Sequence, residues 1–136
     1  MSAVRRRVGR GVALAGGLLL GTACGTSPLL EGLADVERVE ILVLESFPVQ
    51  VHALVEGHLA DPCTHLEPPE QRREGQTFWV TLTTSRDPAS FCAQLLVPFT
   101  TTVSLDVLGL KAGTYTVDVN GVAATFTLAV DNAPQS

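Results

Sequence analysis

The sequence lacks the short motifs that identify many small enzymes. It contains no G-x-S-x-G turn, no phosphate-binding loop, no G-x-G-x-x-G pattern and no C-x-x-C pair. Its serines at positions 46, 85, 90 and 104 lie in ordinary strand-like or turn-like contexts. We therefore expect a protein that is not an enzyme and carries no cofactor, although carboxylates that pair in space are invisible in a sequence.

Long apolar runs are also missing. Residues 12–20 are apolar but include two glycines, and a membrane-spanning helix needs about 20 consecutive apolar residues. Four arginines, at positions 5–7 and 10, precede this run, and the small residues 21–23 follow it. This order is typical of a secretory signal peptide, so we expect residues 1–23 to direct export and to be removed.

Basic residues are scarce beyond that segment. Of the nine Lys and Arg residues, four lie within residues 1–23, whereas all fourteen Asp and Glu residues come later. Residues 24–136 therefore carry a net charge of −9 when the histidines are neutral. So acidic a surface disfavours nucleic acid and anionic lipid headgroups as partners, and it favours solubility.

Cys24 directly follows the small residues that end the signal peptide. This arrangement resembles the lipobox of bacterial lipoproteins, except that Gly21 stands where a lipobox usually carries Leu. The resemblance implies that Cys24 becomes the mature N-terminus and carries a diacylglycerol and an N-acyl chain such as palmitate. More than one acyl chain gives stable anchoring, so the expected location is the extracytoplasmic side of the cell membrane or the outer membrane. The departure at Gly21 concerns lipidation rather than export and leaves plain export as the alternative.

Most of the chain after residue 35 alternates apolar and polar residues. Alternation is clearest at residues 39–44, 49–56, 77–85, 103–108, 115–120 and 122–130. A period of two is typical of half-buried antiparallel strands, and Asn120-Gly121 is the sequence of a type I′ hairpin turn. Pro68 and Pro69 indicate an edge strand or loop, and residues 91–97 are ambiguous between strand and loop. No window predicts a helix, and about six to eight short strands are expected.

The segment from Leu110 to Tyr115 resembles the L-x-x-G-x-Y segment of fibronectin type III and related bacterial sandwich domains. The resemblance implies a tyrosine corner, in which the hydroxyl reaches back to the backbone a few residues upstream. We therefore predict an all-β fold, a single immunoglobulin-like antiparallel β-sandwich over residues 36–131. Residues 1–23 form the signal peptide, residues 24–35 a tether and residues 132–136 a C-terminal tail.

Cys63 and Cys92 form an even pair once Cys24 is assigned to lipid. Because an exported protein meets an oxidising compartment, we expect them to form a structural disulfide. A bridge closing a loop of about 30 residues contributes roughly 3.5 kcal/mol in the chain-entropy treatment.

The three histidines, His52, His58 and His65, fall within fourteen residues of each other, near Asp61 and Cys63. Their spacing matches no known zinc module, and Cys63 is better used in the disulfide. We therefore expect no metal site.

Trp79 is the only tryptophan, and it lies within an apolar strand pattern. Phe78, Val80 and Leu82 share the predicted core face, which leaves Trp79 among threonines on the opposite face. Trp79 is then either packed in the core or at an edge, or an exposed anchor for a partner.

These features predict an exported, membrane-anchored lipoprotein that acts as a non-enzymatic binding or structural module, its candidate partner a protein of the cell envelope. The alternative is an envelope inhibitor of an exported hydrolase, with residues 57–76 and 84–100 as recognition loops. A small hydrolase has the least support. The sequence alone identifies no ligand.

Overall fold

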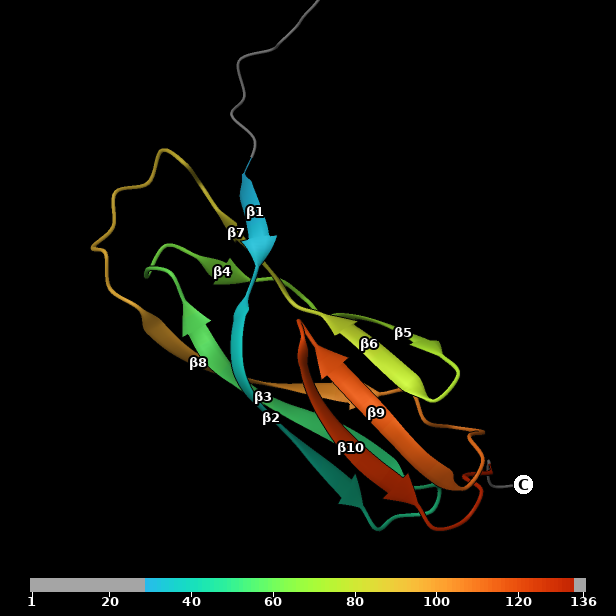
Figure 1. Ribbon diagram of the computed structural model, residues 1–136. Coiled ribbons are helices and arrows are strands. Elements are labelled where there is room, and N and C mark those ends of the chain that lie inside the picture. The colour runs from blue at the N-terminus through green and yellow to red at the C-terminus, as the bar shows by residue number, and fades with distance from the viewer. Residues whose placement is uncertain (1–28, 134–136) are drawn as a thin grey trace, which may run out of the picture.

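The computed structural model describes residues 29–133. These residues form ten β-strands joined by loops, and no helix occurs among them (Figure 1). They are β1 (Leu30–Leu33), β2 (Asp35–Leu44), β3 (Gln50–Leu59), β4 (His65–Leu66), β5 (Glu70–Glu74), β6 (Thr77–Thr81), β7 (Thr83–Arg86), β8 (Val97–Leu105), β9 (Gly113–Val119) and β10 (Val122–Leu128). This part of the chain accordingly contains no helix of the length and apolarity that a membrane span requires. The expected signal peptide and Cys24 lie outside the described residues.

Two sheets form the body of the molecule, as the alternating sequence predicted. One has the strand order β2-β3-β8 and the other β10-β9-β6-β5. All their pairings are antiparallel except that β6 runs parallel to β9. The polar strand β5 follows Pro69 and lies at a sheet edge, where a proline-flanked strand is tolerated. The predicted all-β sandwich is therefore confirmed, with one parallel pair as a departure.

A small third sheet, in the order β1-β7-β4, arises because two strands change partners midway. β1 and β2 are separated only by Ala34, and β6 and β7 only by Leu82. β1 pairs with β7, whereas β2 pairs with β3 and β6 with β5 and β9. The backbone N–H of Ala34 donates to the carbonyl oxygen of Leu82 at 2.9 Å, so the two junctions meet.

The side chain of Asn120 satisfies the backbone groups at this meeting point. Its Nδ2 donates to the carbonyl oxygens of Ala34 and Leu82, both at 2.8 Å. Its Oδ1 accepts from the Leu82 N–H at 2.9 Å. Ala34 and Leu82 are both buried, so the Ala34 carbonyl oxygen and the Leu82 N–H depend on Asn120 for these bonds, whereas the Leu82 carbonyl oxygen also accepts from the Ala34 N–H.

Asn120 also begins the β9–β10 turn that its sequence predicted. Asn120 and Gly121 both have positive φ, 49° and 95°, and Val119 pairs with Val122. A two-residue turn with positive φ at both central positions is of type I′, which confirms the prediction from Asn-Gly.

The core lies between the two large sheets and comes from the predicted apolar faces. Its largest fully buried side chains are Val51, Val55, Phe78, Leu82, Val103, Val117 and Val119. The rings of Phe78, Tyr115 and Phe126 pack against one another with centroids 5.5–6.2 Å apart. The hydroxyl of Tyr115 donates to the carbonyl oxygen of Lys111 at 2.7 Å, so the tyrosine corner is present.

Both ends of the domain differ from the expected boundaries. β1 lies within residues 24–35, where the sequence predicted a tether, because β7 offers a partner strand that local sequence does not reveal. Asn132 lies within the expected C-terminal tail but is buried, and its side chain bonds to backbone groups of Val49 and Val107. The ordered sandwich therefore extends at least from β1 to Asn132.

Candidate functional site

One end of the sandwich, where β1 begins, exposes six large apolar side chains. Three come from Leu29 and β1, and three from the loop between β7 and β8. They are Leu29, Leu30, Leu33, Phe91, Leu95 and Leu96. Each is more than half exposed, from 55% for Leu29 to complete exposure for Phe91. We call this surface the apolar end.

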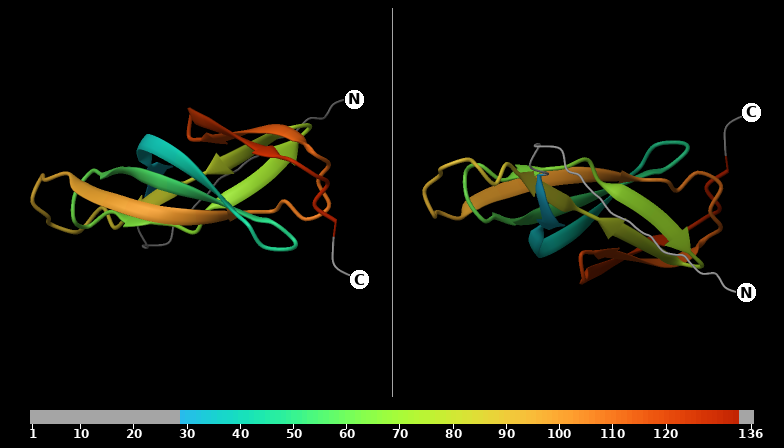
Figure 2. Two further views of the ribbon diagram at one scale, coloured as in Figure 1. Left: turned by 90° about the horizontal axis from the view of Figure 1, so that it is seen from below. Right: turned by 90° about the horizontal axis from the view of Figure 1, so that it is seen from above.

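The two segments of the apolar end lie next to each other in space. Leu33 and Leu96 line one open hollow of about 180 Å³, and Leu29 and Ser90 line another of about 380 Å³. In the two views of Figure 2, the β7–β8 loop lies at one end of the elongated molecule and the β8–β9 loop at the other. The loop part of the apolar end therefore lies at one end of the molecule, and the rest lies on β1, an edge strand of the third sheet.

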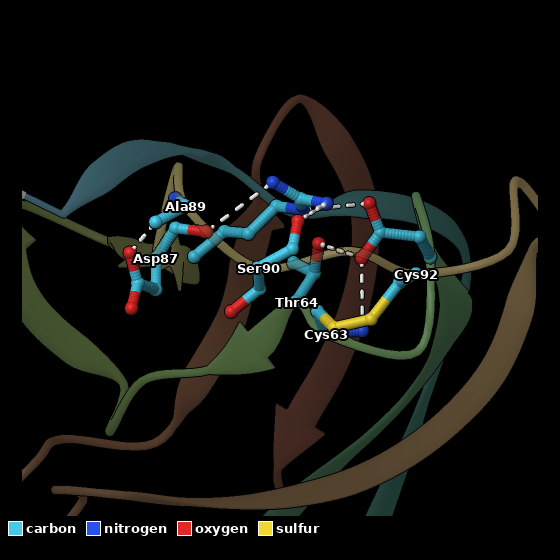
Figure 3. Close-up of a disulfide and its surroundings, with 8 residues drawn as sticks. Cys63, Thr64, Asp87, Ala89, Ser90 and Cys92 are labelled. Atoms are coloured by element: carbon cyan, nitrogen blue, oxygen red, sulfur yellow. Dashed lines mark hydrogen bonds and ion pairs between the residues drawn. A yellow bond between two sulfur atoms is a disulfide. The ribbon is translucent and has the colours of Figure 1, made fainter.

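A disulfide joins this loop to the turn that follows β3. Cys63 and Cys92 are bonded, with their Cα atoms 6.0 Å apart, so the predicted bridge is confirmed (Figure 3). The bridge has a sequence separation of 29 residues and joins the β3–β4 segment to the β7–β8 loop, whose flanking strands pair as β3 with β8 and β4 with β7. It fixes the middle of a loop whose neighbouring side chains point outward.

Arg86, the last residue of β7, holds the base of the same loop. Its Nε donates to Asp61 Oδ2 at 2.8 Å, and its Nη2 donates to the Ser90 carbonyl oxygen at 3.1 Å. The Asp87 carboxylate accepts from the Ala89 N–H at 2.9 Å, a local turn visible in Figure 3. The loop is therefore anchored at its base and by the disulfide, while its apolar side chains stay free of the core.

The carboxylate of Asp61 accepts hydrogen bonds at the base of this loop, and these bonds change its pKa. Partial burial raises the pKa of this carboxyl, but hydrogen bonds from Thr64, Arg86 and the Cys63 N–H lower it by more. The net pKa lies below the ordinary Asp value, so Asp61 stays ionised and Arg86 stays paired at neutral pH.

Trp79 lies on the outer face of β6, away from the core side of that strand. It is 37% exposed, and the Arg72 guanidinium of the edge strand β5 lies 5.8 Å from the ring centroid. The sequence predicted this face correctly. Of the two roles weighed for Trp79, packing at the sheet edge is the one the contact with Arg72 favours.

The three histidines have different neighbours. In the strand register His52 lies opposite Ser104 and His65 lies opposite Ser85. The side chain of His58 contacts Glu37, with Nδ1 2.6 Å from Glu37 Oε2. Asp61 is paired with Arg86 and Cys63 is in the disulfide, so neither remains for a site with these histidines.

A different group of possible metal donors was missed by the sequence reasoning. Atoms of Asp35, Glu37 and His58 lie within 4.8 Å of one another. Asp35 pairs with His58 across β2 and β3, and the register shifts between Val36 and Arg38, so only strand register could have shown this. We assign no metal site to this group, because the direct contact between His58 and Glu37 explains why these side chains lie close together.

Comparison with known proteins agrees with the architecture. The class that the strands define is an all-β sandwich, and residues 53–128, from β3 to the end of β10, match the model of the ORF11 beta-sandwich domain. The chain belongs to this family. The match includes the β7–β8 loop and excludes β1 and Cys24.

Three small proteins of Herpetosiphon aurantiacus are similar to the chain. The uncharacterized 10.2 kDa protein in the HgiCIIM 5' region is 38% identical over 93 residues, which is 68% of this chain and 98% of that protein. The corresponding proteins in the HgiBIM and HgiEIM 5' regions are each 39% identical over 83 residues, 61% of this chain and the whole of each relative. No solved structure matches the chain. The family model therefore supports the fold, and the function is argued from the molecule.

Proposed function

We propose that this protein is an exported lipoprotein, attached to a membrane through Cys24, that acts as a non-enzymatic binding or structural module of the cell envelope. The observation that carries the proposal is the division of the three cysteines. Cys63 and Cys92 are bonded to each other within the sandwich, which leaves Cys24 at the lipobox-like position. A structural disulfide is typical of proteins that fold in an oxidising compartment, and this supports export.

The position of β1 fits an anchor at Cys24. Leu29 lies five residues after Cys24, and an extended chain spans at most about 3.6 Å per residue. A lipidated Cys24 therefore lies within about 18 Å of Leu29, the first residue of the apolar end. An anchor this short holds that end of the sandwich close to the membrane surface.

The proposal is tested by mass spectrometry of the mature protein from a bacterial host that processes lipoproteins. We expect an N-terminus at Cys24 that carries the mass of the diacylglyceryl and N-acyl groups, and recovery in the membrane fraction. Cys24→Ser should be recovered unlipidated and outside the membrane fraction. Gly21→Leu, which restores the usual lipobox residue, should raise the processed fraction. An unmodified N-terminus at another position in the parent protein would refute the lipoprotein assignment.

A further inference from the structure

The loop part of the apolar end carries no charged side chain. Residues 88–96, which include Phe91, Leu95 and Leu96, contain no Asp, Glu, Lys or Arg, whereas residues 24–136 carry a net charge of −9 and β1 exposes Glu31. Monomeric proteins seldom expose several large apolar side chains together unless they contact something. The uncharged loop therefore favours an apolar contact over an electrostatic one.

We infer that the apolar end rests in the interfacial layer of the membrane that carries the protein, with the side chains of Phe91, Leu95 and Leu96 inserted among uncharged lipid headgroups and upper acyl chains. The inference rests on the proposed function, because the anchor at Cys24 is what brings this surface to the bilayer. The short span from Cys24 to Leu29 keeps Leu29, the first residue of the apolar end, within about 18 Å of the lipid attachment. The membrane is therefore the apolar environment that this surface meets first.

The construction of the loop suits shallow insertion. The disulfide of Cys92 and the contacts of Arg86 fix the loop before it binds, so little conformational entropy is lost on contact. Residues 87–96 form no strand, so their backbone N–H and C=O groups are not paired in a sheet. Such groups need water, and this keeps the loop backbone out of the hydrocarbon core. Side-chain insertion of about 5–10 Å, at the boundary of headgroups and acyl chains, satisfies both conditions.

The first test measures binding of the mature chain, residues 24–136 with Cys24→Ser, to phosphatidylcholine vesicles. This chain keeps every described strand and removes the acyl chains, so the protein surface alone is assayed. We expect the double variant Leu95→Ser and Leu96→Ser to lower the vesicle partition coefficient by about tenfold for each leucine. A tenfold change corresponds to the free energy gained when one such side chain leaves water.

A matched control lies at the opposite end of the sandwich. Leu108 and Val130 are 55% and 62% exposed, close to the 62% and 64% of Leu95 and Leu96. Replacing Leu108 and Val130 by serine should leave partitioning unchanged. Equal losses in the two pairs would show non-specific apolar binding and would overturn the inference.

The second test locates the loop in the lipidated, membrane-bound protein. Phe91→Trp in a Trp79→Phe background places the only tryptophan on the loop, and brominated lipids quench fluorescence in proportion to contact. We expect strong quenching at position 91 and little quenching of Trp79 in the parent protein, because Trp79 packs against Arg72 on the outer face of β6.

The outcomes separate this inference from the proposed function. A lipidated Cys24 with no quenching at position 91 would overturn the inference and leave the anchor intact. Vesicle binding that depends on Leu95 and Leu96 without any lipid at Cys24 would remove the anchor and keep the lipid contact. If the same variant instead dissolved a dimer or a complex with an envelope protein, without affecting vesicle binding, the surface would be a protein interface and the inference would be wrong.

Discussion

Replacing Asn120 tests whether the junction of the three sheets depends on one side chain. Asn120 bonds to the backbone of Ala34 and Leu82 through three hydrogen bonds of 2.8–2.9 Å. Asn120→Gly keeps the positive φ of the turn accessible but removes all three bonds. The variant therefore isolates the amide from the turn.

The magnitude follows from the count of bonds. A hydrogen bond contributes about 1 kcal/mol net, so Asn120→Gly should lower the free energy of unfolding by about 3 kcal/mol. For a domain of this size that corresponds to a fall in Tm of about 10–20 °C. Asn120→Ala should cost about 1 kcal/mol more, because alanine is strained at a left-handed φ.

Asn120→Asp is the closest isosteric comparison. It keeps the side-chain shape and an acceptor for the Leu82 N–H, but it replaces the donor nitrogen by an oxygen facing two carbonyl oxygens. Because like polar groups then face each other in a partly buried site, this variant should lose at least as much stability as Asn120→Gly above the pKa of the new carboxyl.

Urea unfolding with the disulfide intact, followed by the fluorescence of Trp79, provides the measurement. The unfolding midpoint should fall while the m-value stays constant, because the surface exposed on unfolding is unchanged. If the free energies of unfolding of Asn120→Gly and Asn120→Asp both lie within about 0.5 kcal/mol of the value for the parent protein, the junction does not depend on these bonds and the reasoning fails.

Three further predictions follow from individual contacts. Tyr115→Phe keeps the aromatic packing but loses the bond to the Lys111 carbonyl, and calorimetry should show a loss of about 1 kcal/mol; no change would mean that the hydroxyl is not needed. The double replacement of Cys63 and Cys92 by serine should lower stability by about 3.5 kcal/mol, measured by urea unfolding, whereas a loss below 1 kcal/mol would contradict the chain-entropy estimate. The Asp61 carboxylate, whose pKa is lowered, stabilises the fold fully above its unfolded pKa of about 4, and this contribution is lost as pH falls below that value through the folded pKa. Asp61→Asn should therefore reduce stability at pH 7 and flatten its dependence on pH below about 4, and equal slopes in both proteins would refute the assignment.

Features encoded by neighbouring residues could be predicted from the sequence. The buried faces of β3, β6 and β9 follow from period two, and the β9–β10 turn follows from Asn120-Gly121 because few other residues adopt positive φ. The disulfide could be predicted because Cys63 and Cys92 are the two cysteines left once Cys24 is assigned to lipid, and because an exported protein is expected to meet an oxidising compartment.

Features that depend on distant partners could not be predicted. All four residues of β1 are exposed, so this strand has no apolar alternation and exists through its pairing with β7. The exchange of partners at Leu82 is equally hidden, because the sequence predicts one continuous strand over residues 77–85.

The apolar end could be only partly predicted from the sequence. Residues 84–100 are expected as a recognition loop under the inhibitor alternative, and residues 91–97 are ambiguous between strand and loop. The structure exposes Phe91, Leu95 and Leu96 in this segment. Hydrophobicity alone does not say whether a segment is covered by its own chain or by something else. Only the position of the loop beside β1 made the surface recognisable.

The antiparallel pairing of β1 with β7 has a mechanical consequence. A force applied to the chain at residue 29 and directed along β1 acts first on the pairing of β1 with β7. The four residue pairs from Leu30–Arg86 to Leu33–Thr83 then carry the load together in shear, instead of separating one after another. Force that passes them reaches Ala34, whose carbonyl oxygen accepts from the Asn120 side chain, so β1 resists extension before the main sheets are loaded.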